Sequence, residues 1–262
     1  MNKVSIVIPV YGQWHLVKRN IDSLLKYDRA YINEIIVVDD CSSDANPYNF
    51  DPEVVQLCSN ESNLGYAGTV NNGLRRASSD IIVLLDSDAF AIGPFIQRLV
   101  DVYASNPRIG CVGLGTVNEN GGYVCNYQYE PSVIEFILGQ QLQYKLSIFK
   151  LYEKKNILPH SCAISFRKAC IQEQNYFNDD AFPVLEADVD LCMGIHRSNW
   201  LLVFEKDLIV CHEGGHSYQI NYRRVLLFHK SRWNLLKKYK QITFPVLVKV
   251  MLKARVATEL LI

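Results

Sequence analysis

The sequence is short of several features that define broad protein classes. None of its eight cysteines forms a C-x-x-C pair, which argues against a disulfide framework and favours buried free thiols in a reducing compartment. No run of 18 uncharged apolar residues is present, so we expect no membrane-spanning helix. The formal net charge is +0, which argues against a dedicated nucleic-acid-binding protein. With 262 residues, 49% of them hydrophobic, the chain can bury the core of one large domain.

The first apolar run is also short, because Pro9 interrupts it after only a few residues. It is therefore unlike the apolar region of a secretory signal. We expect a cytoplasmic protein on this basis.

Acidic residues are absent from positions 214–258, which contain ten Lys or Arg residues. Phe228, Trp233, Leu235 and Leu236 lie among these cations. Such a basic amphipathic segment can bind anionic lipid head groups, which would place the protein peripherally on the inner face of the membrane. The alternative is that the C-terminal helices pack on the rest of the protein.

Short apolar runs alternate with helical patterns over the first hundred residues. β-branched and apolar runs predict buried strands at 4–9, 35–38, 54–57 and 81–85. Helical spacing of apolar residues predicts helices near 16–25, 67–77 and 95–103. This alternation predicts an α/β fold with a parallel sheet and right-handed crossovers. Ligands bind such sheets at the carboxyl ends of the strands, where two acidic clusters lie.

The second half of the chain is less regular. We expect further strands at 109–117, 123–127 and 208–211. We expect further helices at 133–155, 188–198 and 222–239. No internal repeat or clear linker is visible, so one domain with a C-terminal helical extension is the simplest organisation.

The two acidic clusters contain the first candidate site residues. Asp86 and Asp88 flank Ser87 at the end of a predicted strand. Carboxylates in this position can hold a divalent cation that also binds phosphate oxygens, although a turn with a helix N-cap has the same pattern. Asp39 and Asp40 follow another predicted strand. A carboxylate there can accept the imide N–H of uracil or thymine, or can cap a helix.

Two further segments combine polar residues with helical patterns. Residues 63–73 combine glycines with amide side chains. This combination allows close approach to an anionic ligand; the alternative is a tight turn with helix–sheet packing. In the predicted helix at 188–198, Asp188 shares one face with Cys192, while Asp190 points well away from it. One of these two carboxylates can therefore enter a cleft, or both can lie in a solvated acidic turn.

The H-E-G-G-H stretch at 212–216 matches the H-E-x-x-H pattern of zinc metallopeptidases. That pattern requires a helix, and each interior glycine destabilises a helix by about 1 kcal/mol relative to alanine. The apolar run before it places His212 at the end of a strand instead. We interpret His212 as a single ligand to a metal held mainly by Asp88; a zinc peptidase is the alternative.

Together these segments resemble the family 2 glycosyltransferases with the GT-A fold, and within them the bacterial rhamnosyltransferase-like members that build surface polysaccharides. The resemblance extends from about Val4 to Ser217. It rests on segments that occur in the family's order: VSIVIPVY (4–11), VVDDCSSD (37–44), NLGYAGTVNNG (63–73), LDSD (85–88), DVDLC (188–192) and VCHEGGHS (210–217).

The resemblance implies transfer of a sugar from a UDP- or dTDP-sugar to a hydroxyl of a glycan or lipid-linked glycan, with inversion and with Mn²⁺ or Mg²⁺. It assigns the metal to Asp86, Asp88 and His212, and the catalytic base to Asp188. The donor-binding residues that it implies are Pro9, Tyr11, Asp39, Asp40, Asn63, Gly65, Asn71, Asp86 and Ser87.

The resemblance also implies a domain organisation. A catalytic GT-A domain would occupy 1–217, with a nucleotide-binding half at about 1–115 and an acceptor-binding half at about 116–217. A helical extension would follow at 218–262. The chain departs from the family at Ala187, where a glutamate usually precedes the base. This departure leaves open an alternative in which the fold binds a nucleotide sugar with little turnover.

Overall fold

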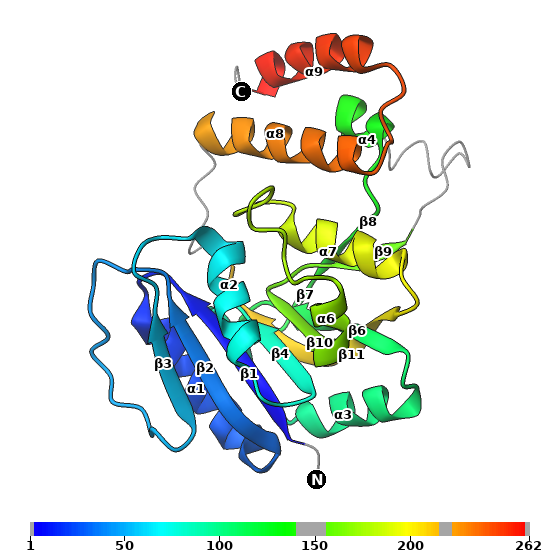
Figure 1. Ribbon diagram of the computed structural model, residues 1–262. Helices are drawn as coiled ribbons and strands as arrows, with labels where there is room; N and C mark the ends of the chain where they lie inside the picture. Colours follow the sequence, from blue (N-terminus) through cyan, green and yellow to red (C-terminus); the bar gives the residue numbers. More distant parts are fainter. Residues whose placement is uncertain (1–2, 140–155, 215–221, 260–262) are drawn as a thin grey trace.

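The computed structural model describes residues 3–139, 156–214 and 222–259 (Figure 1). Within these residues, the main sheet has the order β3-β2-β1-β4-β10-β6-β11-β5, with β7 paired to β6, and a small second sheet pairs β8 with β9. The strands are β1 (Val4–Val10), β2 (Ile32–Asp39), β3 (Val55–Ser59), β4 (Ile81–Leu85), β5 (Ala89–Ala91), β6 (Ile109–Val117), β7 (Tyr123–Val124), β8 (Tyr127–Tyr129), β9 (Ile157–Pro159), β10 (Ala163–Arg167) and β11 (Leu201–His212). The helices are α1 (Trp14–Asp28), η1 (Arg29–Tyr31), α2 (Gly65–Arg76), α3 (Ile96–Ser105), α4 (Val133–Leu138), α6 (Lys168–Glu173), α7 (Ala187–His196), α8 (Tyr222–Lys238) and α9 (Pro245–Glu259).

The first four strands form the parallel half of the sheet. β1 lies between β2 and β4 and is parallel to both, and β3 is parallel to β2. Every residue of β1 and β4 is buried, which explains their continuous apolar composition. The four strands predicted in this half are confirmed to within a few residues.

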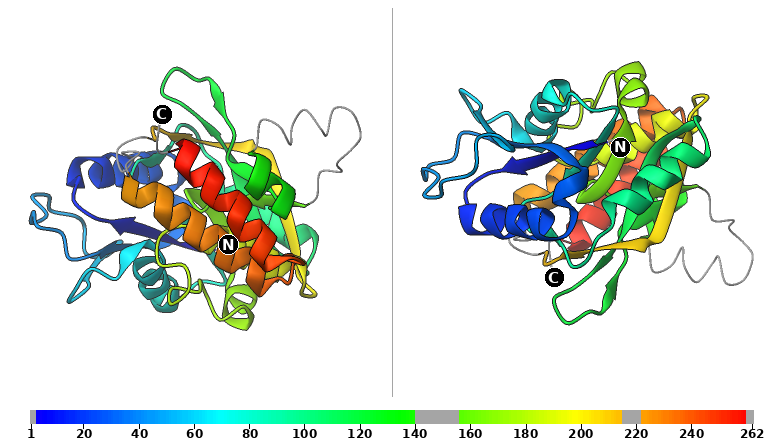
Figure 2. Two further views of the ribbon diagram at one scale, coloured as in Figure 1. Left: turned by 90° about the horizontal axis from the view of Figure 1, so that it is seen from above. Right: turned by 90° about the horizontal axis from the view of Figure 1, so that it is seen from below.

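Helices cover both faces of the sheet. α1 and α3 lie on one face, where Val17, Ile21 and Leu99 join strand residues in one apolar cluster. α2, α6 and α7 lie on the other face, where Leu74 and Met193 belong to a second cluster. Figure 2 shows α1 and α2 on opposite sides of the sheet.

The other half of the sheet is mixed rather than parallel. β10 lies antiparallel between β4 and β6, while β11 runs parallel to β6 and antiparallel to β5. The sequence predicted β6 and the last residues of β11 but not β10, whose five residues include Ser165 and Arg167 and so form no long apolar run. The antiparallel β10 places the turn before it beside the carboxyl end of β4.

The C-terminal helices lie above the sheet and its flanking helices (Figure 1). Phe136, Leu236, Val248 and Leu252 form a small apolar cluster that joins α4, α8 and α9. The helix predicted at 222–239 is confirmed as α8. The helix predicted at 133–155 is confirmed only for its first residues, because α4 ends at Leu138 and Gly139 has φ +84. Residues 140–155 lie outside the described residues, as does the expected domain boundary after 217. No described helix has the length and hydrophobicity needed to cross a membrane.

Candidate active site

Three predicted metal ligands meet at the carboxyl end of β4. Suitable ligand atoms of Asp86, Asp88 and His212 all lie within 4.8 Å of one another. The sheet produces this arrangement, because the antiparallel pairing of β5 with β11 sets His212 opposite Ala89. The backbone of the next residue continues the pairing, since Glu213 N donates to Asp88 O at 3.2 Å.

The charges in this group favour a cation. His212 Nε2 lies 3.3 Å from Asp88 Oδ1. Burial lowers the pKa of His212, but its hydrogen bond to Asp88 and the nearby carboxylate charges outweigh burial and raise it. Burial and the charge of Asp88 raise the pKa of Asp86 to about 6. The site is partly buried and offers two carboxylates and one imidazole as ligands. These ligands, and the negative charge of the carboxylates, fit a divalent ion such as Mn²⁺ or Mg²⁺.

Tyr66, near the start of α2, completes the surroundings of Asp86. Its hydroxyl donates to Asp86 Oδ1 at 2.8 Å. Burial and the charge of Asp86 raise the pKa of Tyr66 well above its usual value, so the hydroxyl stays protonated and donates. This contact could not be predicted from the sequence, because a tyrosine on an amphipathic helix usually packs in the core.

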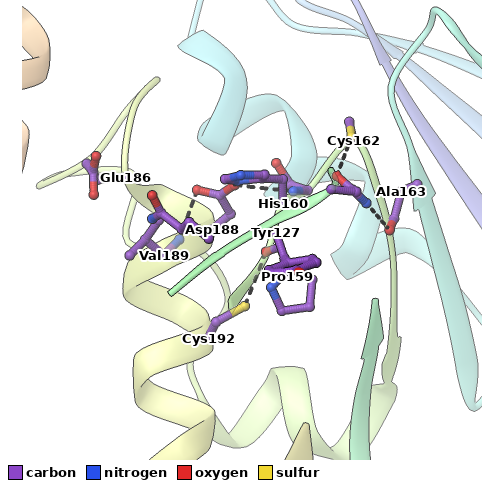
Figure 3. A network of polar contacts seen from close by, with 12 residues as sticks. Tyr127, Pro159, His160, Cys162, Ala163, Glu186, Asp188, Val189 and Cys192 are labelled. Atoms are coloured by element: carbon purple, nitrogen blue, oxygen red, sulfur yellow. Dashed lines mark hydrogen bonds and ion pairs between the residues drawn. The ribbon is translucent and has the colours of Figure 1, made fainter. Parts of the chain in front are cut away.

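Asp188, the predicted base, lies in the first turn of α7 with its carboxylate held by several donors (Figure 3). Its Oδ2 accepts from Ser161 N at 3.2 Å and lies 3.3 Å from His160 Nδ1, and its Oδ1 accepts from Val189 N at 2.9 Å. Burial raises the pKa of Asp188, but the hydrogen bond and charge of His160, with the two backbone donors, outweigh burial and lower it. Asp188 is therefore ionised at neutral pH.

The turn between β9 and β10 connects Asp188 to the metal ligands. Cys162 O accepts from Asp86 N at 3.0 Å, while His160 and Ser161 contact Asp188. The antiparallel pairing that sets Ala163 opposite Leu85 fixes this turn in place. The sequence missed His160 and Ser161, because neither belongs to a recognisable motif.

Asp39 and Tyr11 lie at the ends of the adjacent parallel strands β2 and β1, where donor binding was predicted. Tyr11 follows β1 with 64% of its surface exposed. Pro9 is buried within β1 opposite Val38, whereas Asp39 lies opposite Val10, so Pro9 and Asp39 are on opposite faces of the sheet. Asp39 Oδ1 accepts hydrogen bonds from the backbone and hydroxyl of Ser42. The same hydroxyl oxygen accepts from Gly12 N at 2.6 Å, so the loops after the two strands are tied together around Asp39. Ser87 lies between the two acidic ligands and is half-buried.

Asp40, which was predicted to bind the donor, has a structural role in this protein. It is buried, and its carboxylate oxygens accept from Leu64 N at 2.7 Å, Gly65 N at 3.0 Å and Asn60 Nδ2 at 2.9 Å. The carboxylate thus holds the start of α2. Asn63 is exposed beside it and also accepts from Gly65 N, at 3.2 Å. Gly65 has φ +75, a conformation that suits glycine.

Asn71 requires a correction, because it was predicted to bind the donor. It is fully buried. Its Nδ2 donates to Phe177 O at 2.9 Å, and its Oδ1 accepts from Phe177 N at 3.0 Å. With its side-chain amide used in this way, Asn71 fastens α2 to the segment that leads into α7, and it cannot reach a ligand.

The zinc-peptidase alternative is wrong, because the structure lacks the helix that this motif requires at His212. His212 ends a strand and is followed by Gly214 with φ +65, whereas the peptidase motif needs a helix. Glu213 forms an ion pair with Arg19 and so is not placed as a base. His216 and Ser217 lie outside the described residues.

The acidic residues next to Asp188 pair with α8. Glu186 accepts from Arg232 at 2.9 and 2.8 Å, and Asp190 accepts from Lys238 at 2.8 Å. Asp190 thus points away from Asp188, as predicted. Ala187, where the family has glutamate, is buried in the apolar cluster beneath α7. The basic composition around Arg232 did not indicate that this residue would be an internal partner rather than a surface cation.

The sequence profile described as "Glycosyl transferase family 2" matches residues 5–172. The chain belongs to this family. The Escherichia coli UDP-Glc:alpha-D-GlcNAc-diphosphoundecaprenol beta-1,3-glucosyltransferase WfgD is 35% identical over 107 residues, which are 39% of this chain and 42% of that protein. The undecaprenyl-phosphate 4-deoxy-4-formamido-L-arabinose transferase of Sodalis glossinidius is 32% identical over 131 residues, 46% of this chain and 38% of that protein. The match therefore covers less than half the length of each of these relatives.

Solved structures of other glycosyltransferases share the GT-A fold of this family 2 chain. The mannosyltransferase PcManGT from Pyrobaculum calidifontis, in complex with GDP-Man and Mn²⁺, aligns with a TM-score of 0.61 at 17% identity over 97% of this chain and 69% of that one. S. aureus TarS 1-349 in complex with UDP-GlcNAc aligns with a TM-score of 0.62 at 18% identity over 95% of this chain and 70% of that one. The predicted α/β GT-A fold is thereby confirmed.

Proposed function

We propose that this family 2 protein transfers a sugar from a UDP- or dTDP-sugar to a hydroxyl of a lipid-linked glycan during synthesis of a cell-surface polysaccharide or glycoconjugate. One observation carries the proposal. An ionised carboxylate, Asp188, lies at the same edge of the sheet as a cation-binding group, and a single turn contacts both. A transferase needs these two functions next to each other, because the base and the departing diphosphate act on one sugar carbon.

The donor side of the proposal assigns the nucleotide to the ends of β1 and β2. Asp39 would accept the imide N–H of the base through Oδ2, because its contacts with Ser42 use Oδ1. Tyr11 would border the ring, with the buried Pro9 shaping the end of β1 that leads to it. Asn63 and Gly65 would border the nucleotide from the start of α2. Uracil and thymine present the same imide edge, so this site accommodates both kinds of donor.

The metal side assigns Mn²⁺ or Mg²⁺ to Asp86, Asp88 and His212, with Ser87 between the two carboxylates. When bound, the ion would neutralise the charge that develops on the departing nucleoside diphosphate. Tyr66 keeps Asp86 Oδ1 in place through its hydroxyl. The β5–β11 pairing keeps His212 beside Asp88.

In the transfer step, Asp188 would remove the proton from the acceptor hydroxyl as that oxygen attacks the anomeric carbon. The new C–O bond forms while the bond to the diphosphate oxygen breaks, and the electron pair leaves with the nucleoside diphosphate. Because one base serves one direct displacement, the anomeric configuration inverts, by the same in-line logic as in inverting glycosidases. His160 and the backbone N–H of Ser161 keep the base ionised and oriented.

The names of the relatives guide the choice of substrates. WfgD is named for UDP-glucose and a diphosphoundecaprenol-linked acceptor, and the Sodalis enzyme for undecaprenyl phosphate. A polyprenyl-linked acceptor is therefore the first to test here. The resemblance to rhamnosyltransferase-like members adds dTDP-deoxyhexoses to the donors.

Replacement of Asp188 by asparagine tests the function and separates it from the nucleotide-binding alternative that Ala187 suggests. We expect the wild-type protein to transfer sugar from one donor of the panel to a polyprenyl-linked acceptor. Asp188→Asn should lower kcat by about 100-fold or more while leaving the dissociation constant of the donor nearly unchanged. Asp101→Asn, which changes an exposed acid on α3, is the matched control.

Donor binding without turnover in the wild type, across the whole panel, would favour the binding-module alternative. Equal turnover by wild type and Asp188→Asn would remove Asp188 from the mechanism.

A further inference from the structure

The last helix, α9, exposes apolar side chains on the side that faces away from the rest of the protein. Its inward residues Val248 and Leu252 are only 5% and 7% exposed, packed in the cluster with α4 and α8. Its other apolar side chains and the phenylalanine before it form what we call the outer face of α9: Phe244, Val246, Leu247, Val250, Met251 and Ala254. Val246 is 76% exposed, Leu247 59% and Val250 61%.

The outer face is continuous. At 3.6 residues per turn, positions 246, 250, 254, 247 and 251 follow one another around less than half of the helix circumference. The inward residues 248 and 252 lie on the remaining part. Figure 1 shows α9 as the outermost layer, with α8 between it and the sheet. Isolated exposed apolar residues are common, but a contiguous group on one helix marks an interaction site.

Cations line one edge of this face. Lys249 and Lys253 are exposed one turn apart, between the outer face and the inward residues. The Lys249 ammonium lies 5.3 Å from the centre of the Trp233 ring, which directs it along the surface of α8. Lys237 and Lys240, at the end of α8, are also exposed, and residues 214–258 contain no acidic side chain.

This combination selects one kind of partner. An apolar helix face bordered by lysines is the pattern of helices that lie in the interface of an anionic membrane, where the apolar side chains enter the acyl boundary and the cations meet the head groups. The six residues of the outer face provide no hydrogen-bonding side chain, and the acyl region of a membrane requires none. A protein partner of the usual kind would meet a patch with hydrogen-bonding groups among its apolar ones.

We propose that the outer face of α9 inserts into the surface of an anionic lipid membrane. The contacts of α8 would then fix the catalytic residues relative to that membrane, because Arg232 and Lys238 bind Glu186 and Asp190 on either side of Asp188. A lipid-linked acceptor would reach the site from the same surface. This purpose rests on the proposed function, but membrane binding itself requires neither donor nor transfer.

Flotation of the full chain with vesicles, in the absence of nucleotide, tests the proposal. The vesicles contain equal parts phosphatidylglycerol and phosphatidylcholine, or phosphatidylcholine alone. We expect the protein to float with the anionic vesicles and much less with the neutral ones. The triple variant Leu247→Gln, Val250→Gln, Met251→Gln should lower the partition coefficient by about tenfold or more, because each glutamine removes apolar area that the membrane would bury. Lys249→Gln with Lys253→Gln should lower binding to anionic vesicles and weaken its salt dependence.

A matched control carries three glutamines at apolar positions elsewhere that are also partly exposed: Leu57, Ile92 and Leu201, at 49%, 48% and 37%. It should float like the wild type, and melting temperatures show whether each variant is folded. Absence of flotation, or equal loss in the control, would overturn the proposal. So would a concentration-dependent dimer that the α9 triple variant abolishes while no vesicle binding is seen, since the partner would then be a second copy. Failure of sugar transfer with intact flotation would count against the proposed function alone.

Discussion

Asp188 owes its ionised state to its immediate neighbours rather than to solvent. The carboxylate is largely buried, with 18% of its side chain exposed, and burial alone would favour the protonated acid. His160 Nδ1 and the N–H groups of Ser161 and Val189 reverse this preference. His160 in turn has a raised pKa, because its hydrogen bond to Asp188 and the charge of Asp188 outweigh burial. The pairing with His160 thus keeps the Asp188 carboxylate ionised before a substrate binds.

Replacing His160 by alanine should raise the pKa of Asp188, because the burial remains while the main opposing partner is lost. We expect the acidic limb of the pH profile of kcat/KM to move to higher pH. His15→Ala, which removes an exposed histidine, should leave the profile in place. An unchanged acidic limb in His160→Ala would show that His160 does not act on the base.

The same variant has a defined effect on stability. The lowered pKa of Asp188 contributes stability that is present above its unfolded pKa and lost as the pH falls through its folded pKa. The raised pKa of His160 contributes stability that is present below its unfolded pKa and lost as the pH rises through its folded pKa. The melting temperatures of wild type and His160→Ala should therefore differ most between roughly pH 4 and 6.5, and less at pH 8.

Single residues also show where sequence reasoning stops. Asp86, Asp88 and Asp188 were predictable because they lie in segments that follow the order of the family's motifs, although aspartate at a strand end or helix start can equally cap a turn or helix. Asp40 and Asn71 are of the residue types, and lie in the motifs, from which ligand binding is predicted. Their polar atoms instead form hydrogen bonds with backbone groups of Leu64, Gly65 and Phe177. Only the three-dimensional contacts distinguish the two uses. Tyr66 and His160 act through contacts between distant segments, which no local pattern records.

Among the elements, the predicted ones are those with strong apolar periodicity. β1, β2, β4 and α8 follow from continuous β-branched runs or helical spacing. β5 has only three residues, and β10 contains Ser165 and Arg167, so neither forms a recognisable apolar run. These two strands nevertheless place the turn at 160–162 beside Asp86 and His212 beside Asp88. The site therefore depends on two short pairings, β10 with β4 of the parallel half and β5 with β11.

α8 is an internal element as much as a surface helix. The Arg232 guanidinium is 3% exposed, lies 2.8 Å from Glu186 and 3.6 Å from Glu135, and so joins α8 to α7 and α4. Removing the cation would leave the buried Glu186 carboxylate without the two hydrogen bonds that Arg232 donates to it. Arg232 is thus the residue through which α8 contributes most to stability, although the composition of the helix alone would assign it to a solvated basic face.

Arg232→Ala should lower the free energy of unfolding by about 3–5 kcal/mol, the usual cost of breaking a buried ion pair from one side. Urea denaturation measures it directly. Arg223→Ala, on an exposed part of the same helix, should cost far less, and Arg232→Lys should recover part of the loss because it keeps the charge. A cost for Arg232→Ala as small as that of Arg223→Ala would mean that α8 is not held to α7 through this pair.

For the whole molecule, three layers follow one another from the sheet outward: the strand ends with the candidate site, α7 and α8 joined by ion pairs, and α9 with its apolar outer face. The α/β class and the family were accessible from the sequence because the strand-end motifs occur in order. The position of α8 and α9 relative to the site was not, since it depends on contacts between residues more than 40 positions apart, such as Arg232 with Glu186. The central claim for the molecule is that a cation held by Asp86, Asp88 and His212 binds a nucleoside diphosphate next to Asp188.

Thermal unfolding with UDP or dTDP, each with and without Mn²⁺, tests that claim most directly. A nucleotide present at about 100 times its dissociation constant should stabilise the folded protein by about 2.7 kcal/mol, seen as a raised melting temperature that requires the metal. Asp88→Ala should abolish the increase, while Asp101→Ala, at an exposed acid on α3, should retain it. An increase that persists in Asp88→Ala, or no increase with any nucleotide while Zn²⁺ alone stabilises the protein, would contradict the account.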